Sequence, residues 1–340
     1  MTNTTPTTSG ATVPYRTPAE FAARDVDLHV HTLTSACGYT SHRRLLELTR
    51  AAGRRVVAVT DHDTADGALA LRDLAAQTGD DLLVLVGMEL TTSDFGHVVL
   101  FGRGVEEDWG WKKHSPFPRH LPEHWAAIQA HPFRDLALAG KPFEVGSLPA
   151  LPDRIDAVEV WNGGDVLKKA PQLRPPLERV STAYAREYGK HGVASSDGHR
   201  PIWVHSFFTR FDRELNSLDD AVDQIRTGHV TPMAREEADL SDAVARWRRR
   251  EVVEWRESGK DWRAMAAGAD YDPDDAECRV ALFDQVRTLA RSGATAAQVA
   301  GELGLTPDDA LDYLSIVDEQ DGFAAAAEAR RAKRSVPAAM

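Results

Sequence analysis

Short apolar runs alternate with longer helical stretches over most of the chain, and this alternation constrains the fold more than any other feature. The stretches Ser41–Ala52 and Gly67–Gln77 are rich in Ala, Leu and Glu and lie between such runs. Strands that alternate with helices favour parallel βα units, and therefore a barrel or an open α/β sheet. We expect strands at the apolar runs Val26–Val30, Arg55–Thr60, Leu82–Val86, His97–Phe101, Ala157–Trp161 and Gly192–Ser195.

The composition of the chain changes near both ends, which predicts four segments. Residues 1–22 are rich in Thr, Ser, Gly and Pro and are expected to form a flexible tail. Residues 23–235 contain the alternating pattern and form the predicted α/β domain. Residues 236–330 have apolar residues at helical spacing and no β-like run, so a helical appendage is expected. Residues 331–340 are predicted to be a frayed tail.

Part of the appendage, residues 293–314, resembles a helix-turn-helix, with a turn at Gly304 and Pro307 at the start of the next helix. The alternative is an ordinary helical hairpin that packs or dimerises. The acidic residues Glu302, Asp308 and Asp309 would repel a phosphate backbone, which favours the hairpin.

Charge and cysteine content exclude several classes of protein. The chain has 40 basic and 52 acidic residues, a formal charge of −12, which argues against an extended nucleic-acid surface. No apolar run approaches the roughly 18 residues of a membrane span, and no secretory signal is present. The two cysteines, Cys37 and Cys278, are too far apart for a closely spaced redox or metal motif. We therefore expect a reduced, cytoplasmic protein.

The segment Asp27-Leu-His29-Val-His31 is the strongest chemical signal. Residues two apart in a strand point to the same face, so His29 and His31 could bind one metal together. Imidazole is a common neutral ligand for zinc, manganese and iron. In a chain with 13 histidines such a pair also arises by chance, so it needs support from other residues.

That support comes from the ends of the other predicted strands, where α/β folds place their chemistry. These ends carry Asp61, His62, Asp63, Glu89, His97, His131, Asp197 and His199. Each has a structural alternative, because Asp61 could cap a helix, His131 could lie in a loop before a proline, and Asp197 could hold a turn. Five such strand ends in one domain together favour a metal site.

The motifs DLHVHT, TDHD, GME, HPF and SSDGH, in this order, resemble those of the polymerase and histidinol phosphatase (PHP) family. The resemblance extends from about Asp25 to Val230, and the closing stretch NSLDDAVDQIRTGHV is similar to the last helix of that family. It implies a distorted (β/α)7 TIM-like barrel with two or three metals at the C-terminal ends of the strands. The C-terminal all-helical extension would lie outside this barrel.

The resemblance also implies a ligand set. His29, His31, Glu89 and Asp197 would hold one metal; Glu89 would bridge to a second, completed by His97 and His131; His62 and His199 would hold a third or orient the substrate. Many members place a His or Asp shortly after the first two histidines. The loop of this chain offers only Ser35, Cys37 and, further on, His42 at that point, which departs from the pattern.

The implied activity is that of a metal-dependent phosphatase or phosphoesterase, in which hydroxide activated by manganese, iron or zinc attacks a small phosphomonoester or phosphodiester. Arg134 and Arg200 are candidates to stabilise the substrate's charge, or alternatively form surface ion pairs. Asp61, Asp63 or an unligated histidine could act as general acid. Asp27 and Asp61 are candidates to orient the metal-bound imidazoles.

Three other functions remain open from the sequence. Exonuclease-like cleavage of nucleic-acid ends is disfavoured by the net acidity unless the appendage grips DNA. Hydrolysis of a non-phosphorus bond fits the same ligands. A regulatory barrel joined to a helix-turn-helix is disfavoured by the complete ligand set. Specificity is expected to lie in the loops at residues 104–122 and 165–176.

Overall fold

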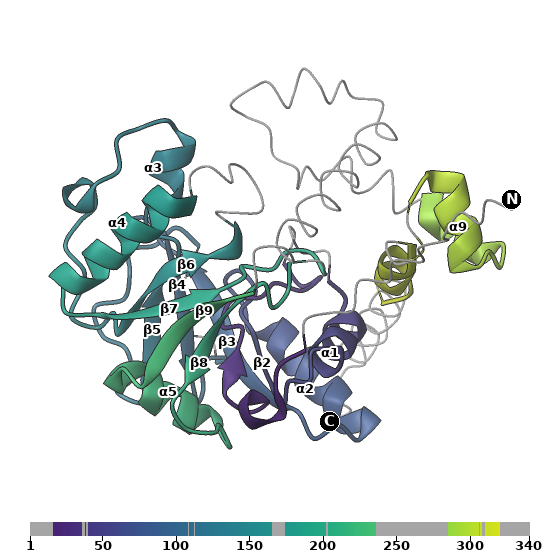
Figure 1. The fold of residues 1–340 in the computed structure, drawn as a ribbon, viewed down its shortest axis with the longest axis horizontal. Helices are drawn as coiled ribbons and strands as arrows, with labels where there is room; N and C mark the ends of the chain where they lie inside the picture. The colour runs from purple at the N-terminus through teal and green to yellow at the C-terminus, as the bar shows by residue number, and fades with distance from the viewer. Residues whose placement is uncertain are drawn as a thin grey trace, which may run out of the picture.

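The computed structural model describes residues 16–35, 38, 40–107, 109–111, 113–164, 174–201, 203–235, 285–305, 307 and 310–319. A curled six-stranded sheet, in the order β2-β3-β4-β5-β6-β7, forms the centre of these residues (Figure 1). Its strands are β2 (Val56–Val59), β3 (Leu83–Thr91), β4 (His97–Gly102), β5 (Trp125–Gln129), β6 (Ala157–Asn162) and β7 (His191–Ser195). A smaller antiparallel sheet consists of β1 (Asp25–Val26), β8 (Phe207–Phe211) and β9 (Val230–Ala234), in the order β1-β8-β9.

Helices lie on both faces of the central sheet. The α-helices around it are α1 (His42–Ala51), α2 (Asp66–Thr78), α3 (Arg134–Leu138), α4 (Arg174–Glu187) and α5 (Leu218–Thr227). The short 3-10 helices are η1 (Ala19–Phe21) and η2 (Val145–Ser147). The predicted last helix is confirmed as α5, which Ser217 caps at its start and left-handed Gly228 ends. The α/β class is therefore confirmed.

The expected all-parallel arrangement is wrong at β4, which runs antiparallel to both β3 and β5. The chain passes from β3 to β4 through the short turn Thr92–Gly96, whereas a parallel pair needs a crossover of a dozen or more residues. The pairs β2–β3, β5–β6 and β6–β7 are parallel, as predicted. The regular βα repeat is thus interrupted in the middle of the sheet.

The first predicted strand, Val26–Val30, is only partly correct. Only Asp25 and Val26 form a strand, which pairs with β8. The following residues cross between the two edge strands of the central sheet, because Val30 bridges Gly198 after β7 and accepts a 2.9 Å hydrogen bond from the amide of Thr60 after β2. The segment that carries His29 and His31 therefore joins β2 and β7, the first and last strands of the curled sheet.

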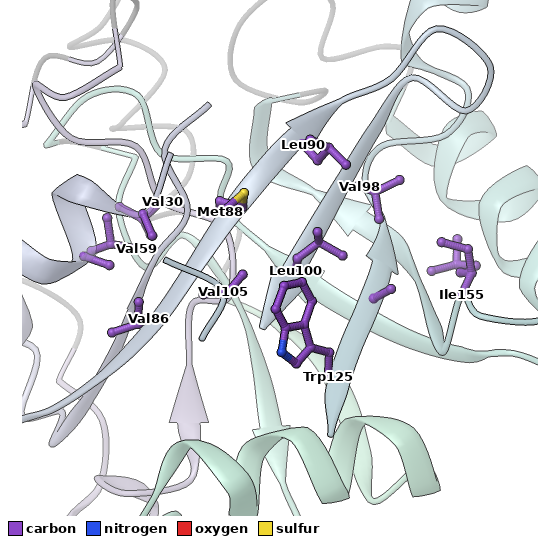
Figure 2. Packing of buried hydrophobic residues seen from close by; sticks show 14 of the residues in the cluster. Val30, Val59, Val86, Met88, Leu90, Val98, Leu100, Val105, Trp125 and Ile155 are labelled. Atoms are coloured by element: carbon purple, nitrogen blue, oxygen red, sulfur yellow. The ribbon is translucent and has the colours of Figure 1, made fainter. Parts of the chain in front are cut away.

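Both faces of the sheet are buried, as expected for strands that read as continuous apolar runs. In β2, Val57 and Val59 face the cluster covered by α1, α2 and α4, whereas Val56 and Ala58 face the cluster covered by α5. Figure 2 shows the first cluster, in which Met88, Leu100 and Trp125 of adjacent strands pack together. The sequence analysis did not predict β8 and β9, and it located only the end of β5.

The described part of the appendage is helical and has its own small core. Residues 285–291 and 310–319 are helical, and α9 (Ala296–Leu303) lies between them. Thr295 and Gln298 form a capping box, and α9 ends at left-handed Gly304, where the sequence predicted a turn. Residues 236–284 of the predicted appendage and residues 165–173 of the predicted loop 165–176 lie outside the described residues, whereas the last three residues of that loop belong to α4. No helix among those described is long and apolar enough to span a membrane.

Leu100 provides a direct test of the packing. Its side chain is fully buried in β4, so Leu100→Ala should lower the free energy of unfolding by about 2–5 kcal/mol. The matched change Leu311→Ala, at a residue 51% exposed on the appendage, should change it by less than about 0.5 kcal/mol. Urea denaturation followed by circular dichroism measures both, and equal effects would contradict the assigned core.

Candidate metal centre

The predicted metal ligands converge on one small region at the C-terminal ends of the parallel strands and the start of β4. They form overlapping groups of three whose potential ligand atoms lie within 4.8 Å of one another. These groups are His31, His62 and His199; His29, His31 and Asp197; His29, Glu89 and His131; and His62, Glu89 and His97. All eight histidines and carboxylates that the sequence analysis assigned to the metals are therefore brought together. Their role as ligands stays a prediction.

Glu89 lies at the centre of the cluster and is almost fully buried on β3. The strand directs its carboxylate away from the apolar cluster that Met88 and Leu90 occupy on the opposite face. Imidazole nitrogens surround both oxygens: His29, His97 and His131 at 3.2, 2.9 and 3.2 Å from Oε1, and His31 and His62 at 3.2 and 2.9 Å from Oε2. Each oxygen of the Glu89 carboxylate therefore has its own set of imidazole neighbours.

Asp197, which follows β7, provides the second carboxylate. Its Oδ1 lies 3.2 Å from Nε2 of His31 and 3.2 Å from Nδ1 of His199. Its φ of 49° is in the left-handed region, and His131 has a φ of 25°. Non-glycine residues in this region are uncommon and concentrate at functional sites, where the surrounding structure holds them in place.

Hydrogen bonds determine which nitrogen of His29 faces the cluster. Its Nδ1 lies 2.9 Å from Oε1 of Glu159, a carboxylate that only accepts, so Nδ1–H donates this bond. In the neutral ring Nε2 then carries a lone pair, yet it lies 3.2 Å from Oε1 of Glu89. Two lone pairs at this distance repel each other unless a proton or a metal ion lies nearby.

His31 has the same arrangement. The hydroxyl of Ser35 donates its one proton to Asp61 at 2.7 Å, so its 3.2 Å contact with Nδ1 of His31 must be donated by the ring. Nε2 of His31 is left to face Glu89 and Asp197, each at 3.2 Å. Ser35 also accepts a bond from the amide of His62 at 3.0 Å, and it therefore holds two of the imidazoles in position.

Unsatisfied polar atoms show that the cluster fits a cation. Among the described residues, Oε2 of Glu89, Oδ1 of Asp197, Nδ1 of His62 and Nδ1 of His97 are buried, and their close contacts with one another and with neighbouring imidazoles do not have hydrogen-bond geometry. Buried polar atoms are normally paired, and buried carboxylates need a counter-charge. Mixed imidazole and carboxylate donors suit divalent manganese, iron or zinc. The residues present therefore fit a divalent metal site.

The electrostatics of the cluster lead to the same conclusion. Burial favours the neutral form of Glu89, but His97, His29 and His62 outweigh it and hold the pKa of Glu89 well below its usual value. Burial also disfavours protonated His29, yet Glu89, Glu159 and Asp197 raise the pKa of His29 well above its usual value. The same carboxylates that favour a proton on this histidine would favour a metal ion, because metal ions compete with protons for imidazole nitrogens.

Asp61 and Asp63 have structural hydrogen bonds. Asp61 accepts from the backbone and hydroxyl groups of Thr32 and Ser35, and Asp63 accepts from the amide and hydroxyl of Thr91. A Cβ on Gly67 would overlap the carboxylate of Asp61, so α2 starts in close contact with it. Asp61 acts on His31 through Ser35, in agreement with its predicted orienting role. The general-acid role of either aspartate stays a prediction.

Asp27 has a different position from the one predicted. Its carboxylate accepts from the amide and hydroxyl of Ser196 and from the amide of His205, at 2.9, 2.5 and 2.7 Å. Burial raises the pKa of this carboxyl to about 6. Asp27 therefore joins backbone segments around the cluster and does not orient the ring of His29.

Glu159, which was not identified from the sequence, orients the ring of His29. Its carboxylate accepts from the ring of His29, the hydroxyl of Ser195, the amide of His131 and the side chain of Asn162. Glu159 is 2% exposed and lies in the apolar strand β6. A single acidic residue inside an otherwise apolar strand was the signal that could have identified it.

The two arginines lie in different surroundings. Nη2 of Arg134 donates to Oδ2 of Asp197 and to Oδ1 of Asn162, each at 2.5 Å, so Arg134 contacts the cluster directly. Arg200 is fully buried, and its guanidinium carbon lies 6.0 Å from the ring centroid of Trp203. The surface ion pair considered for Arg200 is therefore wrong. Contact of either arginine with a substrate stays a prediction.

Comparison with known proteins supports the similarity to the PHP family. Residues 178–230 match the family model described as PHP-associated, which confirms the resemblance that the motifs indicated. Uncharacterized protein MJ1587 of Methanocaldococcus jannaschii is 27% identical over 150 residues, which cover 40% of this chain and 80% of that protein.

Three solved structures are similar at 15–19% identity. PsfC from Pseudomonas syringae PB-5123 has a TM-score of 0.47, and the matched region covers 66% of this chain and 98% of the PsfC chain. A candidate metal-dependent phosphoesterase from Bifidobacterium adolescentis has a TM-score of 0.31, with coverages of 52% and 88%. An amidohydrolase from Chromobacterium violaceum with bound sulfate has a TM-score of 0.30, with coverages of 51% and 87%.

The orienting role of Glu159 can be tested by its removal. Glu159→Gln weakens the acceptor for Nδ1–H of His29, so metal affinity should fall about 10–100-fold. Glu187→Gln, on the exposed end of α4, is the matched control and should leave metal affinity unchanged. Competition with a chromogenic chelator measures both. Unchanged affinity in folded Glu159→Gln protein would show that Glu159 does not position the ligand.

Proposed function

We propose that this protein, a member of the PHP family, is a metal-dependent hydrolase whose substrate is a small phosphomonoester or phosphodiester. The observation that carries the proposal is the convergence of Nε2 of His29 and His31 on the carboxylates of Glu89 and Asp197. Because Nδ1 of each ring is hydrogen-bonded elsewhere, both Nε2 atoms are left to face these anionic oxygens. A cation is the group that such an arrangement accommodates.

The proposed ligand sets are those that the family resemblance implies, and all of their members lie in the cluster. His29, His31, Asp197 and one oxygen of Glu89 would hold one cation, and the other oxygen of Glu89 would hold a second, with His97 and His131. His62 and His199 would hold a third cation or contact the substrate. Divalent cations bound there would lower the pKa of a water molecule and neutralise the charge of a phosphate group.

The chain's own residues would position these groups. Glu159 holds the ring of His29, Ser35 holds that of His31, and Arg134 holds the carboxylate of Asp197. Because Arg134 is at the cluster and 16% of its side chain is exposed, we propose that its guanidinium also attracts an anionic substrate. We further propose that the curled sheet, joined across its edges by residues 27–31, is a distorted (β/α)7 barrel.

A small substrate is favoured over nucleic acid. The chain is acidic overall, with a formal charge of −12. In the helix at residues 310–319, which would be the second helix of a helix-turn-helix, Asp312, Ser315 and Glu319 face α1. Acidic side chains that already contact the α/β domain do not provide a surface for DNA.

The first experiment combines metal analysis of the purified protein with a phosphate-release screen over phosphomonoesters and small diesters. We expect two or three equivalents of manganese, iron or zinc, together with released phosphate. Bound metal without hydrolysis of any phosphoester would indicate a non-phosphorus substrate. Absence of metal, even after reconstitution, would refute the proposed site.

Single substitutions then test the ligands. His29→Ala, Glu89→Ala and Asp197→Ala should each lose bound metal and lower phosphate release by more than about 100-fold, the upper range for residues that only orient a ligand. His229→Ala is the matched control, because this exposed histidine pairs with Asp212 away from the cluster. Circular dichroism should show that all variants stay folded. Full turnover in the three ligand variants would refute the assignment.

A further inference from the structure

The loop that holds the metal cluster also contacts the C-terminal helices. We call residues 32–41, apart from 36, 37 and 39, the site loop, and residues 285–319, within the described ranges, the C-terminal helical unit. Ser35 of the site loop contacts His31, His62 and Asp61. Leu33 of the same loop packs against the apolar core of the C-terminal helical unit. One short segment thus contacts both the cluster and the appendage.

Glu319 accepts hydrogen bonds from the first backbone amides of α1, the helix that directly follows the site loop. Its carboxylate accepts from the backbone amides of His42 and Arg43, at 3.0 and 3.3 Å, and contacts Nδ1 of His42 at 2.5 Å. The first amides of a helix have no partner within the helix, and a negative charge there also interacts favourably with the helix dipole. Ser41 provides only part of this cap, by accepting from the amide of Arg44.

A second polar contact lies one helical turn away. Nε of Arg44 donates to Oδ1 of Asp312 at 2.6 Å, and Asp312 is 3% exposed. The hydroxyls of Ser41 and Ser315 are also in contact. Such a partly buried charge pair is stronger than an exposed one, because water screens it less. Polar contacts and the packing of Leu33 therefore fix the C-terminal helical unit to both ends of the site loop.

We propose that the C-terminal helical unit is a structural part of the metal site, which it stabilises by holding the site loop so that Ser35 keeps His31 and His62 in position. This inference rests on the proposed function, since it assumes that the cluster binds metal. In this arrangement Glu319, Asp312 and Leu33 are positioning residues, because each acts on the cluster through the loop.

If the C-terminal helical unit holds the site loop, the contacts of Glu319 and Asp312 with α1 control how long the cluster retains metal. Glu319→Gln and Arg44→Gln should each accelerate the release of bound metal to a chelator by at least about fivefold, the lower range of coupling between sites. Arg44→Lys keeps the cation opposite Asp312 and should restore most of the retention. Asp318→Asn, an exposed carboxylate on the same helix, is the matched control and should release metal as the unaltered protein does.

Hydrogen exchange provides a readout that does not depend on metal. The amides of Leu33 and Gly38 donate within the site loop, to Thr40 and Ser35, and should exchange faster in Glu319→Gln and Arg44→Gln than in Asp318→Asn. Unchanged exchange and unchanged metal release in both variants would overturn the inference while leaving the proposed function intact. A protein that binds no metal would refute the proposed function, and the exchange rates would still decide whether the C-terminal helical unit holds the loop.

Discussion

The concentration of charge around Glu89 is the constraint on which the rest of the structure depends. A buried carboxylate with imidazoles on both oxygens is stable only if every neighbour is held in a defined orientation and a cation balances the charge. The curled sheet fulfils the first requirement by bringing the ends of several strands together. A layer of acceptors behind the histidines, Glu159 and the pair Ser35–Asp61, fixes the tautomers.

Much of the cluster could be predicted from sequence, because its residues follow short apolar strands in a fixed order. The two-residue spacing predicted that His29 and His31 lie on one face, and the strand-end position of Glu89 predicted that it lies near them, as the structure shows. Glu159 could not be recognised in this way, since its partners His29 and Ser195 come from other strands. Asp27 was misinterpreted for the same reason: it was suggested as an orienting partner of a metal-bound imidazole, whereas its carboxylate contacts Ser196, which is distant in sequence.

The departures from the predicted fold also have physical causes. The reversal of β4 depends on the short turn Thr92–Gly96, and an apolar run alone does not indicate strand direction. The segment after Val26 looked like a strand because it alternates, but its partners are single residues beside two different strands. In the appendage, the caps at Thr295 and Gly304 depend on residues close in sequence, so the sequence can indicate them. The contact of Glu319 with α1 joins residues far apart in the chain, so the sequence does not indicate it.

The order of the ligands along the chain has a consequence for biosynthesis. His29 and His31 leave the ribosome early, but the carboxylate of Asp197 and the ring of His199 that complete their surroundings follow only after the last strand of the central sheet. The proposed site is therefore incomplete until the chain has been synthesised beyond residue 199, and the C-terminal helical unit follows only after that point. In the proposed site, a bound metal ion would therefore stabilise a sheet whose apolar core has already formed, and it would not guide the first steps of folding.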